Sequence, residues 1–399
     1  MSQSPASRAP AGVAVTPPKS SGHELVLTTE ALAFVADLVR TFRPRLELLL
    51  ARRRERQARF AAGQPYDFLG DTADIRDSDW TVFPVRGDLL DRRVEMIRPP
   101  TRLDVIHGLN SDACCFVADF EDPSLWSWDE LVDGQVNLFE AIRRTISVAE
   151  SDGADGHRLH HRVAVLFVRP RGWGSVETNM TVDDRAVPAS LVDFGLFFFH
   201  NAKKLLGHCT APYFYLPSMQ SHLEARLWNE VFVHAQRAIG IARASIKAAC
   251  LIETQPALFE MDEFLWELRE HSCGLHRGRQ ELSADSVERL VSTCHRRGTH
   301  AMGGMVSSDP PSAATPAHDT LRTEKLREVR AGLDGTWVTH PSMVPIAKEV
   351  FNSHMPGPNQ IGARSDGFAE TLESDVHAAG SAASPSAERT VHGPVMRGA

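Results

Sequence analysis

The sequence lacks the features that mark several large classes of protein. No apolar run in its 399 residues reaches the roughly 18 residues that a membrane-spanning helix needs, and the N-terminus has no hydrophobic signal core. The six cysteines form no CxxC pair and the 18 histidines form no HExxH motif, so neither common zinc signature is present. Acidic residues outnumber basic ones by 51 to 43, and a net charge of -8 offers no electrostatic basis for binding nucleic acid.

What is present is the composition of an ordinary globular protein, with 42% hydrophobic and 24% charged residues. We expect a cytoplasmic protein with neither a nucleic-acid nor a membrane partner, while the oligomeric state cannot be predicted. Residues 1–22 are rich in Ser, Ala and Pro and carry no acid, so they indicate a disordered tail, with an organelle transit peptide as the alternative. The final residues MRGA are not a peroxisomal address of the SKL type.

The chain divides into three further parts. Residues 23–90 carry apolar residues at helical spacing and predict a helical N-terminal clasp in which Pro44 separates two helices. Residues 91–358 alternate short apolar runs with helical stretches, as β/α units do. Residues 359–399 offer hardly any apolar cluster, so we expect a disordered tail there.

Within the β/α region, a polar residue closes nearly every apolar run. The runs that we interpret as strands lie at 114–120, 163–168, 213–217, 246–254, 300–305 and 336–340. The helices that we expect lie at 136–147, 221–240, 261–272 and 284–298. An open doubly wound sheet fits the same order, but polar residues at successive strand ends favour a TIM-type β/α barrel, which gathers its chemistry at that rim.

Three of these strand ends carry groups suited to catalysis. Glu121 directly follows the run 114–120 and lies between Asp119, which is inside the run, and Asp122, and paired carboxylates can bind a hard cation or exchange protons. Arg169 follows the next run and can hold a carboxylate or stabilise an enolate. Glu253 closes the most apolar run, where a buried carboxylate needs a cation beside it. The alternatives are a helix cap for the acids near Glu121 and structural ion pairs for Arg169 and Glu253.

Many longer strings resemble malate synthase of the A type, in family order from about residue 24 to residue 360. They include YDFLGDTADIRDSDW (66–80), ADFED (118–122), RPRGW (169–173), SLVDFGLFFFHNAK (190–203), IKAACLIET (246–254), CHRRGTHAMGGM (294–305) and DGTWVTHP (334–341).

The resemblance implies a Claisen-type condensation of acetyl-CoA with glyoxylate and water, giving malate and CoA. It implies Mg²⁺ as the cofactor, bound to glyoxylate and to the protein. Carried over by position, Arg169 is the catalytic arginine, Glu121 a supporting acid and Glu253 the first magnesium ligand. The second magnesium ligand is an aspartate in the family text GLNxGRWDY, and Glu281 stands in its place.

The sequence also departs from the family text. Ser218 replaces the usual lysine after YFYLP, and a segment that the family has between Leu282 and Ala284 is missing, which predicts a barrel short of one strand. The family's C-terminal domain, with its catalytic aspartate, has no counterpart after Gln360. We therefore expect impaired malate synthase activity. The alternatives are a non-catalytic descendant and a C–C lyase similar to the citrate lyase β subunit.

Overall fold

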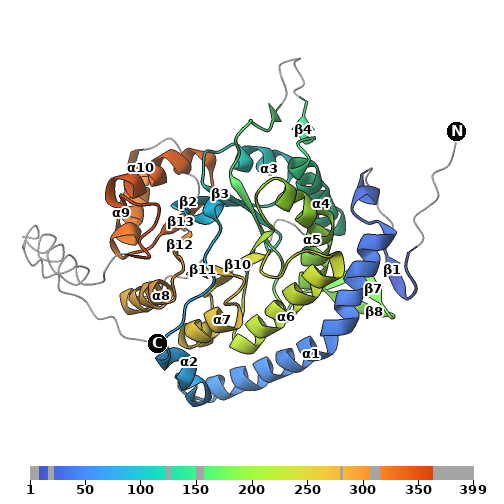
Figure 1. Cartoon of the computed structure of the whole chain (residues 1–399), viewed down its shortest axis with the longest axis horizontal. Helices are drawn as coiled ribbons and strands as arrows, with labels where there is room; N and C mark the ends of the chain where they lie inside the picture. Colours follow the sequence, from blue (N-terminus) through green and yellow to red (C-terminus); the bar gives the residue numbers. More distant parts are fainter. Residues whose placement is uncertain are drawn as a thin grey trace, which may run out of the picture. The chain divides into compact units, whose positions relative to one another are not determined.

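The computed structural model describes residues 9–16, 22–122, 127–149, 157–278, 282–305 and 315–362. At its centre, parallel strands form a closed barrel surrounded by helices (Figure 1), which confirms the TIM-type fold. Each strand pairs in parallel with its neighbours, and β9 pairs with β10 to close the ring. The eight strands are β2 (Val94–Arg98), β3 (Cys115–Asp119), β6 (Val165–Arg169), β9 (Tyr213–Leu216), β10 (Lys247–Leu251), β11 (Ser272–His276), β12 (Ala301–Met305) and β13 (Gly335–Val338).

The predicted loss of a barrel strand is wrong. Two strands, β2 and β11, are absent from the sequence interpretation, and β11 pairs with β10 on one side and β12 on the other. The text of β11 is Ser-Cys-Gly-Leu-His, which lacks β-branched residues and contains a glycine, so it resembles the end of the preceding helix. Gly274 itself has a φ of +125°, and a Cβ there would lie 2.2 Å from the His300 carbonyl oxygen, so this strand depends on a glycine.

Helices cover the outside of the barrel. The helix expected at 136–147 begins earlier, at Trp128, because Ser127 and Glu130 form a capping box at its N-terminus. Apart from α1, the helices are α2 (Ala73–Asp77), α3 (Arg102–Leu109), α4 (Trp128–Ile142), α5 (Ala189–Gly207), α6 (His222–Ile239), α7 (Met261–Glu267), α8 (Ala284–Arg296), α9 (Thr315–Arg330) and α10 (Val344–His354).

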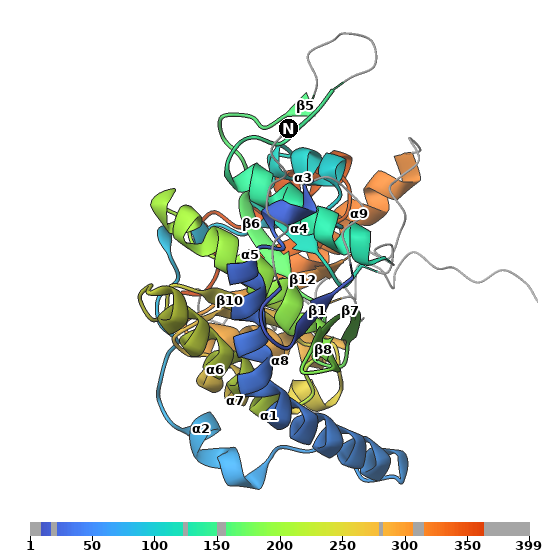
Figure 2. The same cartoon turned by 90° about the vertical axis from the view of Figure 1, so that its right-hand side faces the viewer.

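The N-terminal clasp is dominated by one helix, α1 (Thr29–Ala61), which runs along the outside of the barrel (Figure 2). Pro44 lies inside α1, so the predicted division into two helices is wrong. Proline removes one backbone hydrogen bond, but α1 buries apolar residues on both sides of Pro44, from Ala31 to Leu49, and packs on α5 and α6. This burial outweighs the missing bond and keeps the helix continuous.

Part of the predicted N-terminal tail is ordered. Val13–Val15 forms β1, which pairs antiparallel with β7 (Val176–Val182), and β7 pairs in turn with β8 (Arg185–Pro188). Arg40 of α1 holds the segment before β1 in place by donating to the Ala11 carbonyl oxygen at 2.9 Å. Backbone pairing therefore orders a segment whose composition predicted disorder. Residues 1–8, 17–21 and 363–399 lie outside the described residues, and with them most of the predicted tails.

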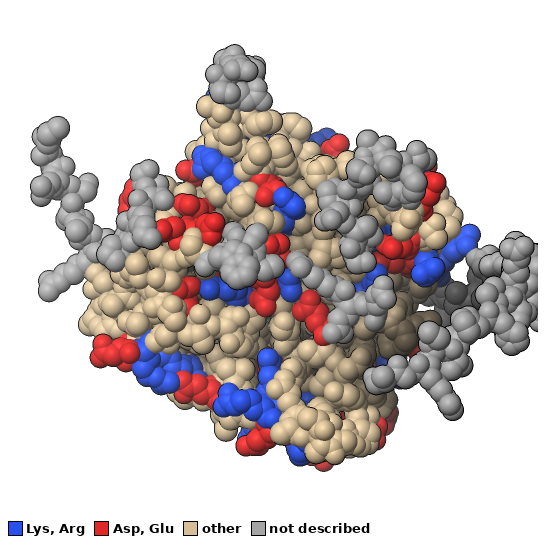
Figure 3. Space-filling view, turned by 180° about the vertical axis from the view of Figure 1, so that it is seen from behind, with Lys and Arg blue, Asp and Glu red and all other residues tan. Residues whose placement is uncertain are grey.

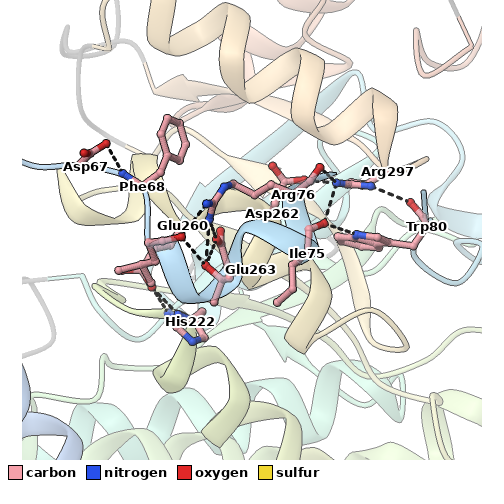
Figure 4. A network of polar contacts seen from close by, with 12 residues as sticks. Asp67, Phe68, Ile75, Arg76, Trp80, His222, Glu260, Asp262, Glu263 and Arg297 are labelled. Carbon is pink, nitrogen blue, oxygen red and sulfur yellow. Dashed lines mark hydrogen bonds and ion pairs between the residues drawn. The ribbon is translucent and has the colours of Figure 1, made fainter. Parts of the chain in front are cut away.

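Ion pairs attach the chain between α1 and β2 to the outside of the barrel (Figure 4). Arg76 of α2 pairs with Glu263 of α7, and the Arg297 guanidinium bonds Asp262 at 2.7 Å and the Ile75 carbonyl at 3.1 Å. Glu263 is fully buried and Asp262 nearly so, and removing one partner of such a pair leaves an uncompensated charge. The clasp is therefore fastened to α7 and α8 by charge as well as by apolar packing.

The barrel interior beneath the rim combines a polar network with a cluster of buried apolar residues that includes Phe167, Leu251 and Trp337. The fully buried Arg92 donates to Glu95 at 2.7 Å and to the Cys273 carbonyl at 2.7 Å, and Trp337 donates to Glu95 at 2.9 Å. Tyr215 bonds both Arg92 and Glu95. Because these groups satisfy one another, the interior is a packed floor under the strand ends rather than a pore.

The surface agrees with the modest net charge. On the face shown in Figure 3, basic and acidic side chains are interspersed instead of forming large patches of one sign. None of the helices in the described part of the chain has the length and apolar character needed to cross a membrane.

Candidate active site

Arg169 is the last residue of β6 and lies opposite Asp119, the last residue of β3, in the parallel register. Its guanidinium contacts the Asp119 carboxylate at 3.1 Å and the Glu253 carboxylate at 3.3 Å. Burial alone would lower the pKa of Arg169, but the carboxylates of Asp119, Glu253 and Glu121 raise it above its ordinary value. The rim therefore holds a permanently charged, 4% exposed guanidinium between acids.

Glu253 stands two residues beyond β10 and is fixed from three directions. Its Oε1 faces Arg169, and its Oε2 accepts a hydrogen bond from the Ser218 amide at 3.2 Å. Gly278, with a φ of +67°, covers its other side, because a Cβ at that position would lie 2.5 Å from the Glu253 Cγ. Only a glycine allows the loop after β11 to approach this carboxylate so closely.

Glu121 is the third sequence-predicted residue at this rim. Its Oε2 accepts a hydrogen bond from the Gly172 amide at 2.5 Å, and its own amide donates to Asp119 at 3.0 Å. Burial raises the pKa of Glu121 to about 6, and the negative charges of Asp119 and Glu253 act in the same direction against the opposing effect of Arg169. A carboxyl with that pKa can accept or release a proton near neutral pH.

The structure thus brings Arg169, Glu121 and Glu253 together at one rim, while Glu281 lies outside the described residues. Arg171 points elsewhere and pairs with Asp193 at 2.8 Å and with Glu177 at 3.0 Å.

Sequence reasoning did not identify the backbone amides of Gly172 and Ser218 as partners of the two glutamates. It also did not identify His276, whose Nδ1 accepts from the Gly278 amide at 2.9 Å. Only their positions in the sequence could have indicated these two amides, since Gly172 belongs to the RPRG string and Ser218 directly follows YFYLP.

The chemistry of these groups suits a hard cation only in part. Within the described residues, no three potential ligands are grouped at metal-binding distance. Glu121 and Glu253 nevertheless offer carboxylate oxygens, the donors that Mg²⁺ prefers, and their mutual repulsion contributes to the raised pKa of Glu121. A cation between these acids would relieve that repulsion, so the residues present fit Mg²⁺ but supply an incomplete ligand set.

Comparison with known proteins places the chain among malate synthases. The family model described as "Malate synthase, TIM barrel domain" matches residues 165–290 and 280–377, and "Malate synthase, N-terminal domain" matches residues 11–74. The two barrel matches meet at 280–290, where the sequence departs from the family text.

Curated relatives agree with the family models. The chain is 48% identical to "Malate synthase" of Myxococcus xanthus over 394 residues, covering 90% of this chain and 73% of the relative. It is 42% identical to "Malate synthase, glyoxysomal" of Cucumis sativus over 388 residues, covering 88% of this chain and 68% of the relative. It is 42% identical to "Malate synthase" of Arabidopsis thaliana over 386 residues, covering 87% of this chain and 69% of the relative.

Proposed function

This chain belongs to the malate synthase family, and we propose that it condenses acetyl-CoA with glyoxylate and water to give malate and CoA. The observation that carries the proposal is the Arg169 guanidinium, fixed at the rim of a closed barrel between Asp119 and Glu253 and beside Glu121. Fixed positive charge at the place where negative charge develops is the largest single contribution to many acyl-transfer reactions.

Arg169 is proposed to stabilise the enolate of acetyl-CoA. Two of its nitrogens are engaged by Asp119 and Glu253, whereas Nε is buried and has no hydrogen-bond partner among the described residues. A buried donor without a partner costs about 1–3 kcal/mol, so a substrate oxygen that accepted from Nε would recover that free energy on binding. The neighbouring acids orient the guanidinium before the substrate arrives, which lowers the cost of reaching the reactive geometry.

Glu121 is proposed as the supporting acid. With a pKa raised to about 6, its carboxyl changes protonation close to neutral pH, and a positioned group of this kind contributes roughly 100- to 10,000-fold to a proton transfer. The Gly172 amide holds one carboxylate oxygen and leaves the other for a proton.

Glu253 and Glu281 are proposed as ligands of Mg²⁺, which, when bound, would polarise the aldehyde carbon of glyoxylate. Glu281 comes three residues after Gly278 in the sequence, and Gly278 is the residue that covers Glu253. Glutamate is one methylene longer than the aspartate of the family text, and Mg²⁺ tolerates little departure from octahedral geometry. We therefore expect weak magnesium binding.

The test is release of free CoA by purified protein supplied with acetyl-CoA, glyoxylate and Mg²⁺, followed with a thiol reagent. We expect glyoxylate-dependent release that is slower than the roughly 10 s⁻¹ typical of enzymes and that Arg169→Ala abolishes, with Arg169→Lys as the charge-preserving control. CoA release that does not depend on glyoxylate, or that continues in the Arg169→Ala variant, would contradict the proposal.

The remaining expectations stay predictions. Impaired turnover, the cytoplasmic location and a non-catalytic role are decided by that assay and by localisation of the protein. Nothing in the described residues favours the C–C lyase alternative, since the acids at the rim are those that the condensation also needs.

A further inference from the structure

We propose that Arg53 of the N-terminal helix α1 is a positioning residue of the active site, which holds the turn at Ser218 so that the Ser218 amide fixes Glu253. The consequence for catalysis rests on the proposed function, because it is there that Glu253 acquires its role. The contact itself is independent of that function and can be tested without any ligand.

Ser218 has an unusual backbone conformation. Its φ of 55° lies in the left-handed region, which a residue with a Cβ adopts at a cost and which persists only where the surroundings enforce it. Both of its backbone groups are engaged. The amide donates to Glu253 Oε2 at 3.2 Å, and the carbonyl oxygen accepts from Arg53 Nη2 at 2.9 Å. One strained residue therefore connects α1 directly to the rim.

The rest of the turn is held from the same two sides. The Met219 carbonyl accepts from the Thr254 hydroxyl at 3.0 Å, next to Glu253, and the Gln220 carbonyl accepts from Arg56 at 2.9 Å. Bonds from the end of β10 and bonds from α1 thus alternate along three consecutive residues. The Gln220 amide also donates to Glu224 of α6 at 3.1 Å. If the bonds from α1 were removed, the bonds from the end of β10 would remain at Ser218 and Met219, and the bond to Glu224 at Gln220.

Arg53 is itself rigidly placed. Its Nε donates to Glu224 of α6 at 3.0 Å, its Nη2 also pairs with Glu224, and the two side chains are 14% and 2% exposed. A planar guanidinium can bond a carboxylate and still present an N–H to a nearby carbonyl, whereas a lysine ammonium is a single point of contact. Glu224 therefore orients the Arg53 guanidinium, and the guanidinium binds the turn at Ser218.

A displacement of Ser218 would alter the positions of both Glu121 and Glu253. A Cβ built on Gly172 would lie 3.5 Å from the Ser218 Cβ and 3.5 Å from the Glu121 Oε1, so these residues pack closely. Since the Gly172 amide binds Glu121 and the Ser218 amide binds Glu253, the turn is a common support for the two acids.

The first test measures hydrogen exchange of the backbone amides at 217–220 in the protein without ligand. Arg53→Ala is combined with Glu224→Gln, because the nearly buried Glu224 would otherwise lose its counter-charge and threaten folding. We expect exchange of the Ser218 amide to be at least about tenfold faster in this double variant than in Glu224→Gln alone, because opening of the turn limits exchange and Glu224 also accepts from the Gln220 amide. Arg52→Ala, at the neighbouring and exposed position of the same helix, is the matched control and should leave the exchange unchanged. Equal protection of the Ser218 amide with and without Arg53 would overturn the proposal.

The second test asks whether relief of the strain replaces the arginine. Glycine adopts the left-handed conformation without a steric cost, so in a Ser218→Gly background the loss of Arg53 should accelerate exchange by at most a third of the factor seen with serine. A merely structural role of Arg53 predicts the same factor in both backgrounds, which would also overturn the proposal.

The third test concerns the reaction. We expect the Arg53 variant to lower kcat for CoA release at least tenfold, and Ser218→Gly to restore part of it, while Arg52→Ala has wild-type kinetics. Absence of glyoxylate-dependent turnover in the wild-type protein would refute the proposed function and leave the exchange experiments to judge the role of Arg53. Turnover that is normal in the Arg53 variant would refute that role alone.

Discussion

Along the rim formed by β3, β6, β9 and β10, one guanidinium joins the carboxylates of two other strand ends, whereas around the ends of β11 and β12 no residue in the described part of the chain links the strand ends in this way, and a buried imidazole and a guanidinium each keep one nitrogen unbonded. In the first region, which we call the paired arc, Arg169 joins Asp119 to Glu253, and Glu253 binds the Ser218 amide. Among the described residues, Arg169 Nε and Trp173 Nε1 are buried in this arc without a hydrogen-bond partner. In the second region, the divergent arc, His276 Nε2 and Arg277 Nε are buried without a hydrogen-bond partner among the described residues.

The difference follows the sequence in part. The paired arc carries the matching strings RPRGW and IKAACLIET together with Ser218, which departs from the family text, while the divergent arc combines the departing text from Gly274 with the matching string that ends in β12. An unsatisfied buried donor costs about 1–3 kcal/mol, so the divergent arc contributes less to stability than its burial suggests. We infer that the paired arc keeps the geometry of the rim.

The largest expected effect comes from breaking the paired arc at its centre. Arg169→Ala removes the cation that pairs with both the fully buried Asp119 and Glu253, and breaking a buried pair in this way costs about 3–5 kcal/mol. Urea unfolding would measure the loss, and Asp119→Asn in the same chain should restore part of it. Arg277→Ala is the comparison from the divergent arc, where Glu328 keeps its bond to Lys325. An equal loss in the two arginine variants would remove the distinction between the arcs.

A second effect tests the electrostatics of the paired arc through pH. The pKa of Glu121 is about 6 in the folded protein against an ordinary value of 4.5, so folding favours the protonated carboxyl. Its contribution to stability is complete below pH 4.5 and is lost as the pH rises through 6, a change of about 2 kcal/mol. The free energy of unfolding of the wild type should therefore fall relative to Glu121→Gln over this range. A constant difference between the two proteins would show that Glu121 has an ordinary pKa.

A smaller effect concerns the proposed magnesium ligand Glu253 of the paired arc. Calorimetric titration should show weak Mg²⁺ binding that Glu253→Gln weakens at least about tenfold, because one carboxylate of an incomplete ligand set is lost. Glu55→Gln, an exposed glutamate of α1, is the control for a simple change of charge. Tight binding that does not depend on Glu253 would place the cation elsewhere.

The positions of Arg169, Glu121 and Glu253 could be predicted from the sequence because parallel strands of a barrel end at one rim, so three strand-end residues suffice to locate it. β11 could not, since its polar and glycine-containing text becomes a strand only through its two neighbours. The conformation of Ser218 could not either, because Arg53, which lies 165 positions away in the sequence, supplies one of its two bonds. Local patterns predict which strands exist and where they end, and contacts between distant residues decide what fixes their ends.

The smallest expected effect sharpens the comparison inside the divergent arc. The His276 ring packs against Trp337 with centroids 3.8 Å apart and the planes tilted by 37°, and its Nδ1 accepts from the Gly278 amide. The proton therefore resides on Nε2, which has no partner among the described residues. Burial and the cations of Arg92, Arg277, Arg169 and Lys325 hold the pKa of this histidine well below its usual value, so it stays neutral.

His276→Phe keeps a ring against Trp337, loses the bond to Gly278 and removes the unsatisfied Nε2–H. Loss of the bond to Gly278 costs about 1 kcal/mol, and removal of the unsatisfied Nε2–H stabilises the protein by a similar amount. The free energy of unfolding should therefore shift by less than about 1 kcal/mol, while exchange of the Gly278 amide accelerates. His276→Asn, which keeps an acceptor near Nδ1, is the control that should protect this amide. A loss of more than about 2 kcal/mol in the phenylalanine variant would mean that Nε2 has a partner in solution, and the divergent arc would then be as fully paired as the other.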